Sequence, residues 1–172
     1  RIEKVGLNSK TDDKGNKEYW AYYAINGGAV FKSKVATSVV TTSGSGEDIT
    51  TNETVTLRQL NDTTDIQEVT INGYSVSQVF SEVVSIEAEE DIVIISGKAK
   101  SASVPLSVLI GVKGDDGDIS DWKGVQLGGL KGMYITGTEI VGGYYYFTAS
   151  NADGTKGYVA AVNLELLKSV PK

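Results

Sequence analysis

The chain has 172 residues, 40% hydrophobic and 22% charged, which suits one ordinary domain and excludes a disordered polypeptide. A net charge of −6 and the lack of a long apolar run argue against nucleic acid as a partner and against membrane insertion. The absence of cysteine and histidine excludes disulfides, thiolate nucleophiles, imidazole zinc sites and catalytic systems built on histidine.

The distribution of polar residues predicts a single domain with short ends. Residues 1–16 are polar and predict an N-terminal tail or an edge strand. Residues 17–168 then form one β-sandwich domain, and residues 169–172 form a C-terminal tail. A cysteine-free, acidic chain rich in Thr, Ser and Gly is typical of a bacterial or viral exterior, so we expect an extracellular, cell-surface or virion-exterior location.

The first half of the chain contains one aromatic strand and one polar stretch. "YWAYYAING", residues 19–27, predicts a strand with Trp20 and Tyr22 on one face. Its closing Asn-Gly pair, like the pair at residues 72–73, favours a tight hairpin turn with positive φ angles. Residues 41–53 contain Ile49 as their single large apolar residue, and they predict a long surface loop or a break between subdomains.

The middle of the chain predicts buried strands. "SVSQVFSE" has apolar residues at helical spacing but many Ser and Val, which favours one or two helical turns near residues 75–82 followed by a strand in which Val84, Ile86 and Ala88 alternate. "EEDIVIISG", residues 89–97, is almost wholly apolar at its centre, as expected of a central strand covered on both faces. "VPLSVLIGV", residues 104–112, has a period-two pattern in which one face is more hydrophobic than the other, as in a strand.

Near the C-terminus, four consecutive aromatic residues precede a polar turn. A strand sends alternate side chains to opposite faces, so Tyr145 and Phe147 in the core would leave Tyr144 and Tyr146 together on the other face, roughly 6.6 to 6.8 Å apart. "GYVAAVNLELL", residues 157–167, predicts a further alternating strand.

These short strands with frequent turn signals predict an all-β fold, an antiparallel β-sandwich or jelly-roll-like arrangement with at most one or two short helical turns.

Exposed aromatic rings on strands and loops favour a ligand-binding role. Sugars present apolar C–H faces that stack on rings and hydroxyl groups that need polar partners. The predicted glycan contacts are Trp20, Tyr22, Trp122, Tyr144 and Tyr146, with Asn151 and Asp153 as polar partners in the adjacent turn. The alternative is ordinary sandwich packing, in which a tyrosine ring packs while its hydroxyl stays in water.

A second candidate site is the acidic loop at residues 111–124. Asp115, Asp116, Asp118 and Asp121 place four carboxylates within seven residues, next to two glycines, and such oxygen-rich loops bind calcium. A solvated Asp-Gly turn explains the same pattern. A structural calcium ion is therefore the one cofactor that the sequence suggests.

Three functional hypotheses follow. The first is a noncatalytic extracellular module that binds a polysaccharide or glycan. The second is a structural or adhesive surface protein (a viral or phage decoration or fibre domain, a pilus or adhesin subunit, or a surface-layer subunit) that contacts copies of itself or neighbouring subunits. The third is a glycoside hydrolase that uses two carboxylates. The glutamates available for it are Glu82, Glu87, Glu89, Glu90, Glu139 and Glu165.

Overall fold

The computed structural model describes residues 2–25, 28–59, 65–100, 106–128 and 131–169. The predicted turn at residues 26–27 and most of the predicted C-terminal tail lie outside these ranges. The elements in chain order are β1 (Ile2–Thr11), β2 (Lys17–Ile25), β3 (Ala29–Ser43), η1 (Gly46–Asp48), β4 (Thr50–Leu57), β5 (Gln67–Glu68), β6 (Thr70–Ile71), β7 (Tyr74–Ser75), α1 (Val76–Val79), β8 (Phe80–Ala88), β9 (Ile92–Ala99), β10 (Ser107–Lys113), β11 (Ile119–Gln126), β12 (Met133–Val141), β13 (Tyr144–Asn151), β14 (Gly157–Asn163) and α2 (Leu164–Ser169).

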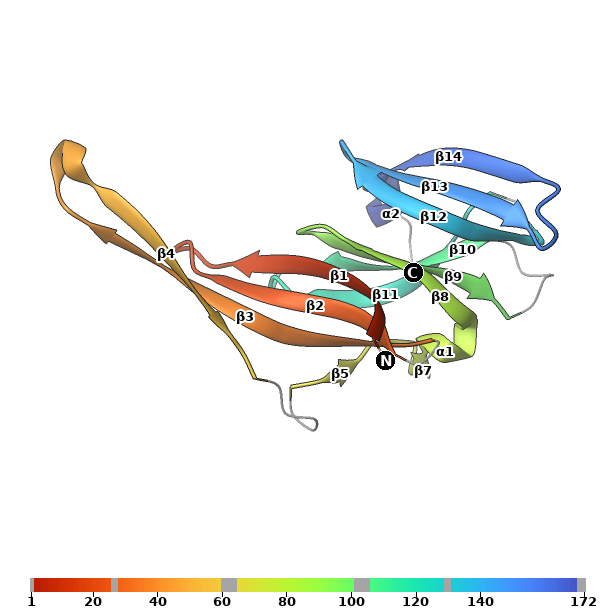
Figure 1. Ribbon diagram of the computed structural model, residues 1–172, viewed down its shortest axis with the longest axis horizontal. Coiled ribbons are helices and arrows are strands. Elements are labelled where there is room, and N and C mark those ends of the chain that lie inside the picture. The colour runs from red at the N-terminus through yellow and green to blue at the C-terminus, as the bar shows by residue number, and fades with distance from the viewer. Residues whose placement is uncertain (1, 26–27, 60–64, 101–105, 129–130, 170–172) are drawn as a thin grey trace.

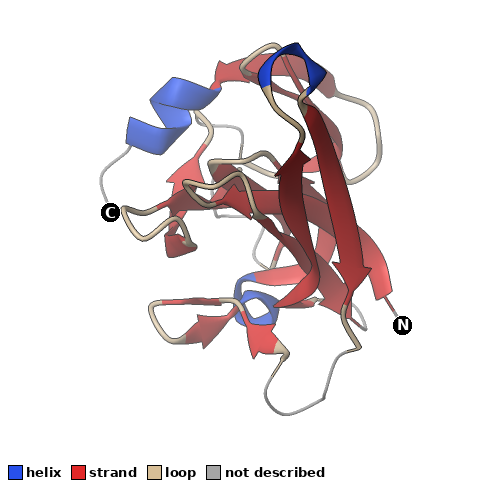
Figure 2. Ribbon diagram, turned by 90° about the vertical axis from the view of Figure 1, so that its left-hand side faces the viewer, coloured by secondary structure: helices blue, strands red, loops and turns tan. Residues whose placement is uncertain are grey.

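The described strands form three main antiparallel sheets stacked in layers (Figure 1). The N-terminal sheet has the order β1-β2-β3-β4 with β5 beside β3, the central sheet β11-β10-β9-β8, and the C-terminal sheet β12-β13-β14. The helices are short and lie at the periphery (Figure 2). The predicted all-β, sandwich-like fold is confirmed. Its connectivity is that of consecutive meanders, since the neighbours along each main sheet path follow one another in sequence.

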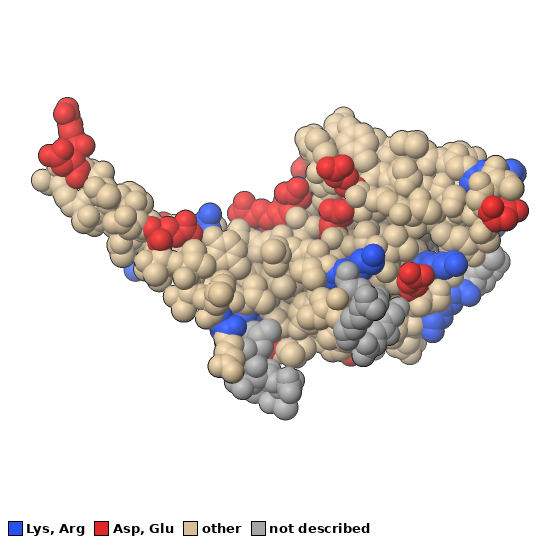
Figure 3. Space-filling model, viewed as in Figure 1, with Lys and Arg blue, Asp and Glu red and all other residues tan. Residues whose placement is uncertain are grey.

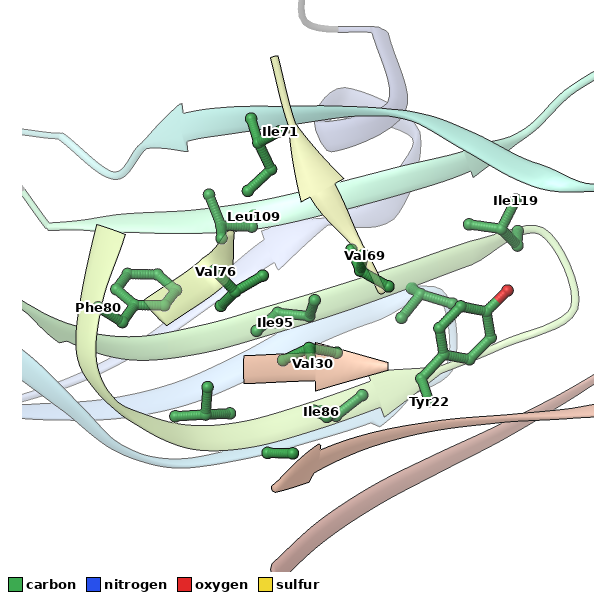
Figure 4. Close-up of a cluster of buried hydrophobic side chains, with 13 residues drawn as sticks. Tyr22, Val30, Val69, Ile71, Val76, Phe80, Ile86, Ile95, Leu109 and Ile119 are labelled. Atoms are coloured by element: carbon green, nitrogen blue, oxygen red, sulfur yellow. The ribbon is translucent and has the colours of Figure 1, made fainter. Parts of the chain in front are cut away.

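The central sheet has a hydrophobic core on each face. Figure 4 shows the first core, where Tyr22 and Val30 of the N-terminal sheet meet Phe80 and Ile95 of the central sheet. The second core lies between the central sheet, the C-terminal sheet and α2. Strand β9 contributes to both, because Val93 and Ile95 enter the first core while Ile92 and Ile94 enter the second. The prediction of a central strand covered on both faces is confirmed.

The transition from helix to strand is as predicted, but the alternation that follows it differs. Helix α1 forms one turn and β8 begins at Phe80. Register shifts in the β8–β9 pairing then place Val84 against the second core, whereas Ile86 belongs to the first. Val84 and Ile86 therefore face opposite layers, because a β-bulge inserts an extra residue and reverses the faces that follow it.

The start of α1 depends on a capping box. The Ser75 hydroxyl accepts a hydrogen bond from the Ser77 backbone N–H (3.3 Å), and the Gln78 side chain accepts one from the Ser75 backbone N–H (2.8 Å). We expect Ser75→Ala to lower the free energy of unfolding by about 1 kcal/mol, and Ser75→Asp to retain most of the stability. Urea denaturation of the two variants measures this difference, and equal stabilities would contradict it.

The structure corrects the prediction of a surface loop or subdomain break at residues 41–53. They do not form a loop but lie within a β-hairpin, in which β3 and β4 pair from Ala36–Leu57 to Ser43–Thr50. Strand β2 begins at Lys17, opposite Ser38, so the pairs beyond this point have no β2 neighbour and project from the body (Figure 1). We call residues 39–57 the arm.

The structure also corrects the prediction of a strand over residues 157–167. The predicted alternation stops at Asn163, and Leu164–Ser169 form α2. Leu164 and Leu167 are buried while Leu166 is exposed, which is the spacing of a helix and not of a strand.

Among the residues that the structure describes, none of the helices has the length and hydrophobicity that a transmembrane helix requires.

Candidate ligand-binding site

Tyr144 and Tyr146, the tyrosine pair, stand on the outer face of the C-terminal sheet. Strand β13 alternates strictly, with Tyr145 and Phe147 buried and the tyrosine pair 42% and 43% exposed. The two exposed rings have centroids 6.3 Å apart and planes tilted by 47°. The four rings therefore point as the sequence predicts, and two of them present apolar surface to solvent.

The register of the sheet determines the polar neighbours of this pair. Asn163 on β14 lies opposite Tyr144, and Glu139 on β12 lies opposite Tyr146. Side chains directly opposite one another on a sheet face are about 4.5 to 5.5 Å apart at Cβ. The Asn163 amide is held in place, because its Oδ1 accepts a hydrogen bond from the backbone N–H of Glu165 (2.8 Å).

A cleft of about 720 Å³ opens beside Tyr144, between α2 and the connection from β8 to β9 in the central sheet. Its polar lining comes from both layers and includes Asp91, Lys113, Asn163, Glu165 and Lys168. Among the described residues, four acidic side chains and two lysines line it, which makes this lining net acidic. Tyr144 thus stands where a flat aromatic surface meets a polar recess.

Ion pairs fix the charged groups of the cleft. Lys168 Nζ lies 2.5 Å from Asp91 Oδ2 and 2.8 Å from Glu165 Oε1, and Lys113 Nζ lies 3.5 Å from Glu90. The hydrogen bonds to Asp91 and then Glu165 raise the pKa of Lys168, so it remains a cation at neutral pH. A ligand entering the cleft meets donors and acceptors that are already oriented.

The predicted polar partners Asn151 and Asp153 lie elsewhere. Asn151 ends β13, seven residues from Tyr144 or roughly 23 Å along the strand. Asn151 Oδ1 accepts from the Lys156 backbone N–H (3.0 Å), and Asp153 Oδ1 accepts from the Thr155 hydroxyl (2.7 Å) and backbone N–H (3.1 Å), which together lower the pKa of Asp153. These side chains stabilise the turn, and the structure does not bring them together with the tyrosine pair.

Tyr22 was predicted as a glycan contact, but the structure buries it. It is 2% exposed inside the first core, and this burial raises its pKa to about 12. The Trp122 ring packs 6.1 Å from the Tyr22 ring, between centroids. A strand residue facing the neighbouring layer is covered by it, so Tyr22 leaves only a small part of its surface at the pocket that it lines together with Trp20.

Trp20 and Trp122 are only partly buried against the first core. Trp20 Nε1 donates to Glu18 (3.3 Å), and Lys32 Nζ lies 5.9 Å from the Trp20 ring centroid. Trp20 borders a pocket of about 110 Å³ and Trp122 one of about 380 Å³. The two tryptophans therefore share one side of the central sheet, and the tyrosine pair belongs to the layer on its other side.

The acidic loop gives the calcium prediction no support. Asp115 is exposed in the turn before β11, Asp116 Oδ1 accepts from the Asp118 backbone N–H (3.0 Å), and Asp118 pairs with Lys10 Nζ (3.0 Å). Asp121 lies within β11 at a φ of 56°. Within the described ranges, no three acidic side chains come close enough together to hold a metal ion.

Two of the glutamates suggested for hydrolysis, Glu139 and Glu165, have different surroundings. Glu139 borders the tyrosine pair, whereas Glu165 lies in the cleft beside Lys168.

Asn163, Asp91 and Lys168 are the site residues that sequence reasoning missed. Helix α2 turns Glu165 and Lys168 to the same side, three residues apart. The sequence did contain a signal for the start of this helix: Asn163 stands directly before "LELLK", and asparagine is a preferred N-cap residue.

Comparison with known protein families, curated proteins and solved structures found no match for this chain.

Proposed function

We propose that the chain is a noncatalytic, extracellular domain that binds a neutral glycan on the tyrosine pair at the mouth of the cleft. The observation that carries this proposal is the exposure of two adjacent rings beside a recess lined with fixed polar groups. Pyranose rings have apolar C–H faces that stack on aromatic rings, and their hydroxyl groups need donors and acceptors nearby.

Each part of the site has a separate role in this proposal. Tyr144 and Tyr146 provide the stacking surface, and Asn163 lies directly beside the first ring. The Lys168 ammonium and the Glu165 carboxylate supply hydrogen bonds to hydroxyl groups at the inner side of the cleft.

The charge of the site favours an uncharged ligand. The lining acids outnumber the lysines, and the whole chain carries a charge of −6. Sulfated or uronic-acid polysaccharides would be repelled by this field, whereas neutral hexose polymers would not.

The test is affinity electrophoresis and array binding on neutral polysaccharides. We expect retention of the unmodified domain and at least tenfold weaker binding in Tyr144→Thr/Tyr146→Thr, a loss of about 1.4 kcal/mol or more. Threonine keeps the strand preference while removing the ring.

Tyr158→Thr is the matched control, because Tyr158 is exposed on β14 opposite Ala149, away from the cleft. Its binding should equal that of the unmodified domain. Absence of retention on every neutral glycan, or equal retention in the double variant, would refute the proposal.

A further inference from the structure

The arm is exposed on both of its faces. Every residue from Thr41 to Leu57 is exposed, including Ile49, Val55 and Leu57. An isolated two-stranded ribbon is at best marginally stable in water, because no layer covers either face. Exposed apolar side chains on such a ribbon mark a surface that gains stability from a partner.

The tip of the arm combines an apolar residue with negative charge. Ile49 is 56% exposed and directly follows Glu47 and Asp48 in the turn of the hairpin. Residues 35–57 contain three acidic residues and no lysine or arginine. Figure 3 shows the acidic side chains at this extremity of the molecule.

The opposite end of the N-terminal sheet has the complementary character. A groove of about 650 Å³ lies where β2 ends and β3 begins, lined by Ile25, Ala29, Phe31, Phe80 and Lys100 together with small residues. Within the part of the chain that the structure describes, its lining contains one lysine and no acidic residue.

We infer that the arm of one copy docks into this groove on a second copy, with Ile49 against the apolar floor and Glu47 and Asp48 beside Lys100. One strand, β3, carries the groove at its beginning and the arm at its end, roughly 46 Å apart. Donor and acceptor surfaces at opposite ends give a head-to-tail contact, which closes into a ring or extends into a filament. The contact is independent of the glycan proposal, because the groove and the cleft share no lining residue.

Sedimentation velocity across a concentration series at low salt tests the contact. We expect the unmodified protein to form species above its 18.3 kDa monomer mass, and to lose them as salt screens the charges. Glu47→Lys/Asp48→Lys and Lys100→Glu should each weaken association at least tenfold. Mixing these two reversed proteins should restore one contact, because the reversed arm then meets the reversed groove.

Lys14→Glu is the matched charge control, in the exposed turn between β1 and β2, and circular dichroism verifies the fold of each variant. Restored association in the mixture, with Lys14→Glu unaffected, supports the contact. A protein that is monomeric at every concentration overturns it, and so does association that survives either reversal or a mixture that stays monomeric. Glycan binding by the same variants is measured separately and should not change.

Discussion

Gly97→Ala should lower the free energy of unfolding by about 3 kcal/mol, the upper end of the usual range for overpacking a core. A Cβ atom at position 97 would lie 2.4 Å from Phe80 Cγ and 2.6 Å from the Glu82 carbonyl oxygen. Phe80 is buried in the first core and cannot withdraw without leaving a cavity. For a domain of this size, the melting temperature should fall by roughly 6 to 12 °C.

Gly124→Ala is the control for this prediction. The nearest atom to its added Cβ would be Leu109 Cδ2 at 3.8 Å, an ordinary contact. Its stability should stay within about 1 kcal/mol of the unmodified protein. Guanidinium denaturation compares the two variants. Equal stability would mean that the Phe80 ring does not lie over β9 as the structure has it.

The sequence predicted the parts of the fold in which neighbouring layers bury one or both faces of a strand. In β13 the alternation of Tyr144 to Phe147 is visible because each inward residue meets the second core. In β9 the apolar run at Ile92–Ile95 is visible because both faces are covered. In both strands, burial by the neighbouring layers produces the pattern of apolar residues that is seen in the sequence.

Residues 41–53 of the arm were predicted as a loop for a physical reason. Period-two alternation records burial of one face, and β4 buries neither face. A strand surrounded by solvent on both sides has the composition of a loop, here rich in Thr and interrupted by Glu53. What orders it is pairing with β3, which is a nonlocal property.

The site was predicted in part for a similar reason. The orientation of Tyr144 and Tyr146 depends on their own strand, so sequence alone determined it. Their polar neighbours depend on the register between β13 and β14 and on the position of α2, which bring Asn163 and Lys168 to the same end of the sheet. Asn151 and Asp153, the polar partners predicted from the sequence, lie at the other end of β13 and in the turn after it.

Tyr145→Ala and Tyr146→Thr should differ sharply in stability although the residues are adjacent. The Tyr145 ring is 0% exposed and packs 6.1 Å from the Phe147 ring, between centroids. Removing such a ring from a core costs about 3 to 5 kcal/mol. Tyr146 faces solvent, so its replacement by a residue that also favours strands should cost less than about 1 kcal/mol.

This contrast decides how a loss of glycan binding is to be interpreted. If Tyr146→Thr keeps its stability and loses binding, the ring contributes to recognition and not to the core. If it loses as much stability as Tyr145→Ala, the second core extends to the outer face and weakened binding would reflect unfolding. Thr148 already occupies the same exposed face of β13, so a threonine at position 146 introduces no side chain that this face does not carry. The stable, non-binding outcome is therefore the one that we expect from thermal unfolding measured beside the binding assay.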